Sequence, residues 1–183
     1  MSAHAAGTPS IQYTATARAL HWLTAALILF MAPVGIVMAN FSLGPTGHVL
    51  YDIHRSIGAI LLPIMLLRLA YRLKNPPPAL PADLLAIQRF AAHATHWALY
   101  GLLILQSVVG WVATSAYRAP IKVFWLFELP PIWPVNQPFS EQMFTVHRWL
   151  GIFIALLLCA HIGAALFHHF IRKDDILLRM VGR

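Results

Sequence analysis

The sequence has little of what soluble enzymes use for chemistry. It holds one cysteine among 183 residues, and only 10% of its residues are charged whereas 59% are apolar. A single cysteine excludes a disulfide framework, a Cys-x-x-Cys zinc or redox site, a cysteine-ligated iron–sulfur cluster and covalent c-type haem attachment. The length allows one domain, residues 1–183, and a mean hydropathy of +0.67 indicates an integral membrane protein.

Acidic residues are scarce, and all of them fall in predicted loops or at the ends of apolar stretches: Asp52, Asp83, Glu128, Glu141, Asp174 and Asp175. Transporters and proton pumps usually need a carboxylate within the membrane, so these classes are disfavoured. The 13 Lys and Arg residues give a formal net charge of +7. Because long apolar runs separate these residues, they form no continuous basic face, and no nucleic-acid partner is expected.

Four apolar stretches are long enough to cross the hydrocarbon core as helices, which takes about 20 residues. We place them near residues 18–39, 51–72, 90–116 and 143–170. The first lacks the cleavage pattern of a signal peptide and is predicted to be a retained anchor. The run Asn75-Pro76-Pro77-Pro78 ends the second span, and the proline- and aromatic-rich segment 120–142 is expected to lie along the interface. The predicted fold is all-α, a four-helix membrane bundle.

The basic residues predict the orientation of this bundle. Arg18, Arg68, Arg72, Lys74, Arg89, Arg172, Lys173, Arg179 and Arg183 fall on one side, and Arg55, Arg118, Lys122 and Arg148 fall on the other. The side with more positive charge is expected to be cytoplasmic. Both termini are then cytoplasmic, and the expected location is a bacterial inner membrane.

Histidines are the abundant metal-capable residues, and most of the ten lie in or beside the spans: His21, His54, His93, His96, His147, His161, His168 and His169. Any single one of them is most simply an interfacial residue that bonds to backbone or water. However, His147 and His161 are two heptads apart, which places them on nearly one helix face, about 21 Å from each other. Antiparallel spans bring His54 to the level of His147, and His21 enters below His161.

Paired neutral imidazoles inside a four-helix bundle are typical haem ligands, and zinc or di-iron sites are less natural without nearby carboxylates or thiolates. The pattern predicts two b-type haems that carry electrons and have no open iron position. Helix periodicity leaves the inner partner of His21 open. His168 matches His21 in depth. However, about 31 Å of helix would then separate His168 from His147, which is poor for direct electron exchange between two irons. His96 also stays possible.

These residues resemble the bacterial cytochrome b561 family of small four-helix di-haem cytochromes. The resemblance covers residues 18–180. It rests on His21-Trp22, Ile53-His54, the run from Arg68 to Pro81, His93-x-x-His96, Tyr100, Gly110, His147, His161, His168-His169, Lys173-Asp174 and the closing Leu177-Leu178-Arg179-Met180. It implies that His21 and His161 are the axial iron ligands of an inner haem, and that His54 and His147 are those of an outer haem. Residues 1–17 have no counterpart, and His4 and His48 are expected to be solvated.

The resemblance also implies the activity of a superoxide:ubiquinone oxidoreductase. Two superoxide ions would each give up one electron and leave as O₂, and the two electrons would reduce ubiquinone to ubiquinol. Membrane lipid, superoxide and ubiquinone are the expected partners, and no protein partner is required.

Two groups of residues are candidates for handling these substrates. Arg55, Arg118, Lys122 and Arg148 are candidates for steering the superoxide anion on the outer side, and the alternative is that they bind phospholipid headgroups. His168, His169, Arg172 and Lys173 are candidates for the quinone side, and the alternative is a positive-inside anchor.

Two rival functions use the same sequence features. A quinol-oxidising b-type cytochrome subunit would pass electrons through the same haems to a partner redox protein. A haem-free membrane protein would use the histidines for metal or proton transport, which the lack of intramembrane carboxylates disfavours.

Overall fold

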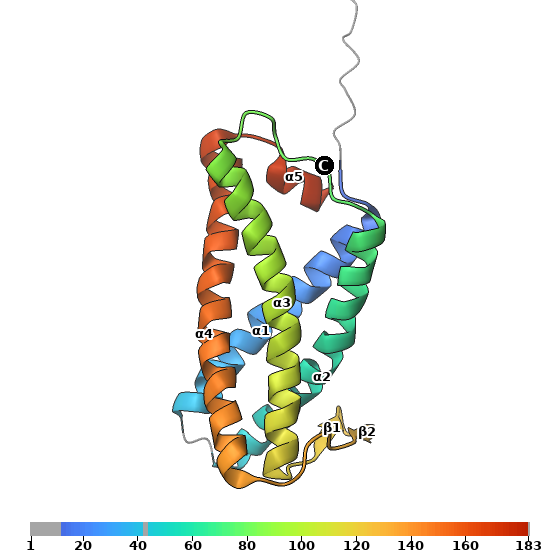
Figure 1. Ribbon diagram of the computed structural model, residues 1–183, viewed down its shortest axis with the longest axis vertical. Coiled ribbons are helices and arrows are strands. Elements are labelled where there is room, and N and C mark those ends of the chain that lie inside the picture. Colours follow the sequence, from blue (N-terminus) through green and yellow to red (C-terminus); the bar gives the residue numbers. More distant parts are fainter. Residues whose placement is uncertain (1–11, 42–43, 183) are drawn as a thin grey trace, which may run out of the picture.

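The computed structural model describes residues 12–41 and 44–182, and its body consists of four long helices packed side by side (Figure 1). Helix α1 spans Ala15–Asn40, α2 spans Gly44–Lys74, α3 spans Ala86–Tyr117 and α4 spans Gln137–Phe167. A π-helical turn, η1 (His168–Arg172), continues α4, and a short helix α5 (Ile176–Val181) follows. Each of the four predicted spans is confirmed as a helix long and apolar enough to cross a membrane. His4 lies outside the described residues.

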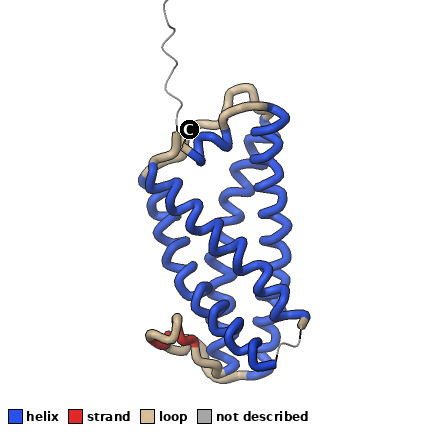
Figure 2. The backbone as a smooth tube through the Cα atoms, turned by 180° about the vertical axis from the view of Figure 1, so that it is seen from behind, coloured by secondary structure: helices blue, strands red, loops and turns tan. Residues whose placement is uncertain are grey.

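The helices alternate in direction, with α2 packed against α1 and α3, and α3 packed against α4. The start of α1 and helix α5 share one end of the bundle, because the Tyr13 amide donates to the Arg179 carbonyl and the Trp22 indole donates to the Met180 carbonyl. We call this the terminal end. The opposite end carries two short strands and is called the hairpin end (Figure 2).

The helix boundaries follow local chemistry. Helix α2 ends at Lys74, just before Asn75 and the three prolines that cannot continue a helix, as predicted. Helix α4 begins at Gln137, earlier than the predicted start at residue 143, because the Asn136 side chain accepts a hydrogen bond from the Phe139 amide and caps the helix. Pro138, read from the sequence as part of an irregular segment, instead fits the first helical turn.

The fold is mostly helical, and an antiparallel hairpin is the exception that the sequence analysis did not foresee. Strands β1 (Ile121–Val123) and β2 (Phe127–Leu129) pair with Lys122 opposite Glu128. Phe124 and Trp125 form the turn with positive φ angles of 46° and 60°, which is unusual for residues other than glycine. The Ser56 hydroxyl accepts a hydrogen bond from the Phe124 amide at 2.9 Å and thereby fixes this turn to α2.

A small buried core fills the middle of the bundle and consists of Ile28, Leu61, Met65, Tyr100, Leu103 and Ile154. The outer faces of the helices carry large apolar side chains such as Phe90 and Leu156, which are 69% and 65% exposed. An apolar outer surface of this kind suits lipid contact. Two buried hydroxyl groups donate to backbone carbonyls: Thr24 to Leu20 within α1, and Ser140 of α4 to Ala113 of α3.

Candidate functional site

Three histidines from three helices meet toward the terminal end. His21 of α1, His96 of α3 and His161 of α4 form this group, which we call the terminal histidine cluster. The His161 ring centroid lies 6.3 Å from that of His21 and 5.4 Å from that of His96. The structure therefore brings the predicted pair His21 and His161 together, and it also brings His96, the alternative from sequence periodicity, against the same ring.

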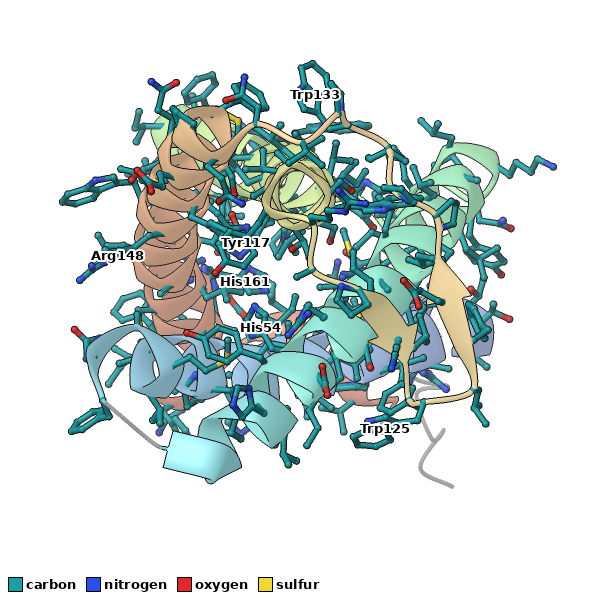
Figure 3. The ribbon with its side chains drawn as sticks, turned by 90° about the horizontal axis from the view of Figure 1, so that it is seen from below. His54, Tyr117, Trp125, Trp133, Arg148 and His161 are labelled. Atoms are coloured by element: carbon teal, nitrogen blue, oxygen red, sulfur yellow. The ribbon has the colours of Figure 1, made fainter. Side chains whose placement is uncertain are left out.

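Two histidines meet toward the hairpin end, and we call them the hairpin histidine pair. The ring centroids of His54 in α2 and His147 in α4 lie 6.1 Å apart, as the sequence predicted for this pair. Both Nδ1 atoms are buried without a hydrogen-bond partner among the described residues. Figure 3 looks along the bundle from this end and shows His54 and, deeper, His161 inside the ring of helices.

Two glycines lie against the hairpin histidine pair, and one of them makes room for it. A Cβ atom at Gly110 would lie 3.0 Å from His147 Cε1, and one at Gly35 would lie 3.5 Å from His54 Cε1. The first distance is too short for an ordinary carbon–carbon contact, so the His147 ring occupies space that only glycine leaves open. The lack of a side chain at Gly110 is thus part of how α3 positions His147.

The distances within the clusters fit two imidazoles that share one metal ion. Ring centroids would then be about 6.4 Å apart, because metal–imidazole bonds are about 2.0–2.1 Å and each ring nitrogen lies about 1.2 Å from its centroid. The observed 6.1 Å and 6.3 Å agree with this value, whereas 5.4 Å between His96 and His161 is shorter. Among the described residues no group of three or more His, Cys, Asp or Glu could hold a metal ion. The histidine pairs therefore suit a metal whose other ligands come from a macrocycle such as haem.

Gln106 was missed by sequence reasoning, although it is a lone amide in the apolar run of α3. Its Nε2 donates to the His147 carbonyl at 3.0 Å, and its Oε1 is buried without a partner among the described residues. Gln106 thereby ties α3 to the turn of α4 that carries His147.

Between the two histidine sites lies the apolar core, with Ile154 and Met65 almost fully buried.

Arg68 and Arg72 were also assigned no site role from the sequence, which placed them among the topological charges. Arg68 Nη2 lies 2.6 Å from His21 Nδ1, inside the bundle. Both guanidinium groups lie over the Tyr100 ring, at 5.2 Å for Arg68 and 5.5 Å for Arg72, and Arg72 also lies 5.5 Å from the Trp97 ring. The terminal histidine cluster is therefore bordered by two inward-facing cations.

The four residues predicted for the quinone side lie together where α4 ends. His168 and His169 belong to the π-helical turn η1, a feature often found at functional sites. His168 Nδ1 lies 2.5 Å from Asp174 Oδ2, and Arg172 pairs with both Asp83 and Asp174. Lys173 is exposed and adopts a left-handed conformation that turns the chain toward α5.

Asp174 is ionised at neutral pH. Burial alone raises the pKa of its carboxyl, but the hydrogen bond with His168, the Ile176 amide and the charge of Arg172 together bring this pKa below the ordinary value of 3.8. An ionised carboxylate only accepts hydrogen bonds, so Asp174 accepts one from the Nδ1–H group of His168 and thereby orients this imidazole.

The four cations predicted to steer superoxide occupy different environments at the hairpin end. Arg55 donates to the Tyr51 and Pro120 carbonyls and lies 3.4 Å from Asp52, so its charge is largely compensated. Arg148 points away from the bundle (Figure 3). Lys122 is exposed on β1.

Arg118, the fourth of these cations, follows α3 and lines a surface pocket of about 620 Å³ beneath the hairpin. Glu128 and Trp133 share the lining of this pocket. An anion entering there would meet the carboxylate of Glu128 as well as the guanidinium of Arg118.

The chain is similar to known proteins over nearly its whole length. The family described as Prokaryotic cytochrome b561 matches residues 12–183. Cytochrome b561 homolog 2 of Escherichia coli (strain K12) is 33% identical over 94% of this chain and 92% of its own length. Cytochrome b561 homolog 1 of the same organism is 30% identical over 90% of this chain and 93% of its own length. A probable superoxide oxidase, CybB, of Yersinia pestis is 28% identical over 94% of this chain and 97% of its own length.

Proposed function

This chain belongs to the prokaryotic cytochrome b561 family, a family of membrane electron-transfer proteins that bind b-type haem, and we propose that it transfers electrons from superoxide to ubiquinone. The observation that carries this proposal is the stacking of two histidine sites on one side of α4, one toward each end of the bundle. The likeness to a probable superoxide oxidase, at 28% identity, supports superoxide as the electron donor.

In this proposal two b haems are held by histidines alone. His54 and His147 hold the haem at the hairpin end, and His21 and His161 hold the haem at the terminal end. The two ring separations of 6.1 Å and 6.3 Å support this assignment, and the shorter His96 contact supports a neighbouring role for His96. When bound, each haem supplies a site that accepts and releases one electron at a time.

The residues at the hairpin end would bring superoxide to the bundle. Two superoxide ions each lose one electron and leave as O₂. Lys122 and Arg118 supply most of the positive charge for this step. Arg55 contributes less because it is paired with Asp52, and Arg148 contributes less because it points away from the bundle. The proposal includes the orientation that the basic residues predict: the hairpin end faces the periplasm, and both termini are cytoplasmic in a bacterial inner membrane.

The residues at the terminal end would complete quinone reduction. Ubiquinone takes up two electrons and two protons to form ubiquinol, so it needs a proton donor beside its binding site. The pairing of His168 with Asp174 gives an oriented imidazole there, and Arg172 holds Asp174 in place. Lys173 and His169 add further donors where α4 leaves the membrane.

Stopped-flow absorbance of the purified oxidised protein mixed with superoxide tests the proposal. We expect rapid growth of the reduced haem band, with a rate that falls as salt is added because the donor is an anion. No reduction by superoxide, in a protein that ubiquinol does reduce, would contradict the proposal. That outcome would instead favour the quinol-oxidising subunit. A purified protein without a haem spectrum would overturn both.

His168 provides a separate test of the terminal end. His168→Ala should slow the reoxidation of the reduced protein by a water-soluble ubiquinone about a hundredfold, because it removes the proton donor. His93→Ala is the matched control, since it removes an exposed histidine at the same end of the bundle. Equal rates in the two variants would remove His168 from the mechanism.

A further inference from the structure

Two arginines beside the terminal histidine cluster have no acidic partner. Arg68 and Arg72 lie one helical turn apart on α2, a spacing at which like charges repel each other. Among the residues that the structure describes, the ion pairs of arginine involve Arg55, Arg172 and Arg179, and neither Arg68 nor Arg72 pairs with a carboxylate. Two uncompensated cations inside a membrane-spanning helix are costly unless an anion joins them.

Both guanidinium groups lie against aromatic rings of α3. Arg68 contacts His21 Nδ1 at 2.6 Å, and its guanidinium lies 5.2 Å from the Tyr100 ring centroid. Arg72 lies over Tyr100 and Trp97 of α3, at 5.5 Å from each ring. Aromatic rings hold a guanidinium plane in place but do not neutralise its charge. A side chain that only anchored the helix would extend toward the interface instead.

The neighbouring phenol does not supply the missing negative charge. Burial raises the pKa of Tyr13 above 10.0, and the opposing effect of Arg72 is smaller. Tyr13 is therefore neutral at physiological pH. Among the described residues, then, no side chain supplies the counter-charge of the two arginines.

We propose that Arg68 and Arg72 form a carboxylate-binding site for the two propionate groups of the haem at the terminal end. This inference rests on the proposed function, which places that haem between His21 and His161. A guanidinium presents two parallel N–H donors that match a carboxylate, and two guanidiniums on one aromatic ring match the two carboxylates on one haem edge. Arg68 lies 2.6 Å from His21 Nδ1 and can only donate, so a propionate that bound Arg68 would also free Nδ1 to carry the proton of an imidazole that holds iron through its other nitrogen.

A cycle of protein and haem variants tests this site. Full-length apoprotein is titrated with haem b and with its dimethyl ester, which lacks both carboxylates, for the wild type and for the double variant Arg68→Gln, Arg72→Gln. At one of the two haem sites the wild type should bind haem b, the free acid, at least tenfold more tightly than the dimethyl ester. The double variant should lose this preference for the acid. Arg89→Gln is the matched control, because it removes an exposed positive charge at the same end of the bundle and should keep the preference.

A redox titration of the haem-loaded proteins gives an independent measurement. In the double variant the midpoint potential of one haem should fall, because the propionate charges are no longer compensated, while that of the other haem stays constant. An equal affinity of the wild type for acid and ester at both sites would overturn the inference without any variant. Unchanged potentials in the double variant would also overturn it.

Neither measurement involves superoxide or quinone. A protein that superoxide fails to reduce, but that prefers the acid at one site, contradicts the proposed electron donor and leaves the carboxylate site standing. A protein that superoxide reduces, but that binds acid and ester equally, contradicts only the carboxylate site.

Discussion

The two histidine sites have similar ligand geometry in different electrical surroundings. The hairpin histidine pair is packed against Gly35 and Gly110, and its neighbouring cation Arg55 is compensated by Asp52. The terminal histidine cluster faces Arg68 and Arg72, which have no acidic partner among the described residues. Steric fit dominates at one site and positive charge at the other. Because nearby positive charge favours the reduced form of a metal centre, we expect the terminal site to have the higher potential.

If both sites hold haem as proposed, this difference predicts a direction of electron flow. Electrons that enter at the hairpin end would move toward the more positive terminal end, where His168 and Asp174 lie. A redox titration that found the higher potential at the hairpin end would reverse the comparison and favour the quinol-oxidising alternative.

The largest expected effect is the loss of one haem. On the proposal of two haems, His161→Ala should reduce the haem content of the purified protein by about half, because it removes a proposed iron ligand from the terminal cluster only. His96→Ala should retain both haems, since the His96 ring lies closer to His161 than two ligands of one iron would lie. Pyridine haemochrome assays measure both results. Loss of a haem in His96→Ala, but not in His21→Ala, would transfer the ligand role from His21 to His96.

A smaller effect, confined to the other site, is expected from Gly110→Ala. The added methyl group would lie 3.0 Å from His147 Cε1, so the ring must move, at a cost of about 1–3 kcal/mol. We expect partial loss of the haem at the hairpin end and a normal terminal haem, measured by low-temperature absorbance spectra. Gly101→Ala on the same helix is the control, because a Cβ there meets nothing within 4 Å. Equal losses in the two variants would mean that Gly110 serves helix packing alone.

The cations of the hairpin end should differ by a few-fold. Lys122→Gln should slow haem reduction by superoxide about twofold to fivefold at low salt, whereas Arg148→Gln, which removes an outward-pointing charge, should not. Neutralisation is preferable to charge reversal, because a glutamate at position 122 would face Glu128 across the hairpin. A salt dependence that Lys122→Gln leaves unchanged would exclude Lys122 from steering.

The smallest effect concerns pH. The pKa of Asp174 is lower in the folded protein than its ordinary value of 3.8. The ionised carboxylate therefore contributes its full stabilisation at pH values well above 3.8, and this contribution is lost as the pH falls through the lowered pKa. Asp174→Asn should therefore unfold at a lower temperature than the wild type at neutral pH, and the difference should shrink below about pH 4. Thermal unfolding in detergent at several pH values measures this. A constant difference across the range would contradict the expected role of the carboxylate.

Much of the site was predictable because helices and membranes impose simple periodicities. The heptad spacing of His147 and His161 and the antiparallel order of spans were enough to predict the meeting of His54 with His147, which the structure contains. The third member of the terminal cluster was not decided in this way. Depth and periodicity left His161, His168 and His96 open beside His21. The structure places His21 and His96 against His161, whereas His168 contacts Asp174.

Two other features were missed, one because it depends on residues far apart in the chain and one because a local capping signal lies among prolines. The hairpin turn at Phe124 and Trp125 lacks the usual glycine or asparagine, and it is held from outside by Ser56. The early start of α4 depends on a single capping residue, Asn136, within a segment whose prolines suggested irregular structure.

The sequence by itself determined four apolar helices, their order and the stacking of histidines along α4, because these properties follow from local hydropathy and from the fixed rise of a helix. Only the tertiary structure decided which cations are compensated. The sequence made Arg55 a candidate for steering superoxide and left Arg68 among the topological charges. In the structure, however, Arg55 meets Asp52 and the Pro120 carbonyl, while Arg68 turns inward to His21 and Tyr100. The direction of a long side chain depends on which helices pack around it, and that information is absent from any single segment.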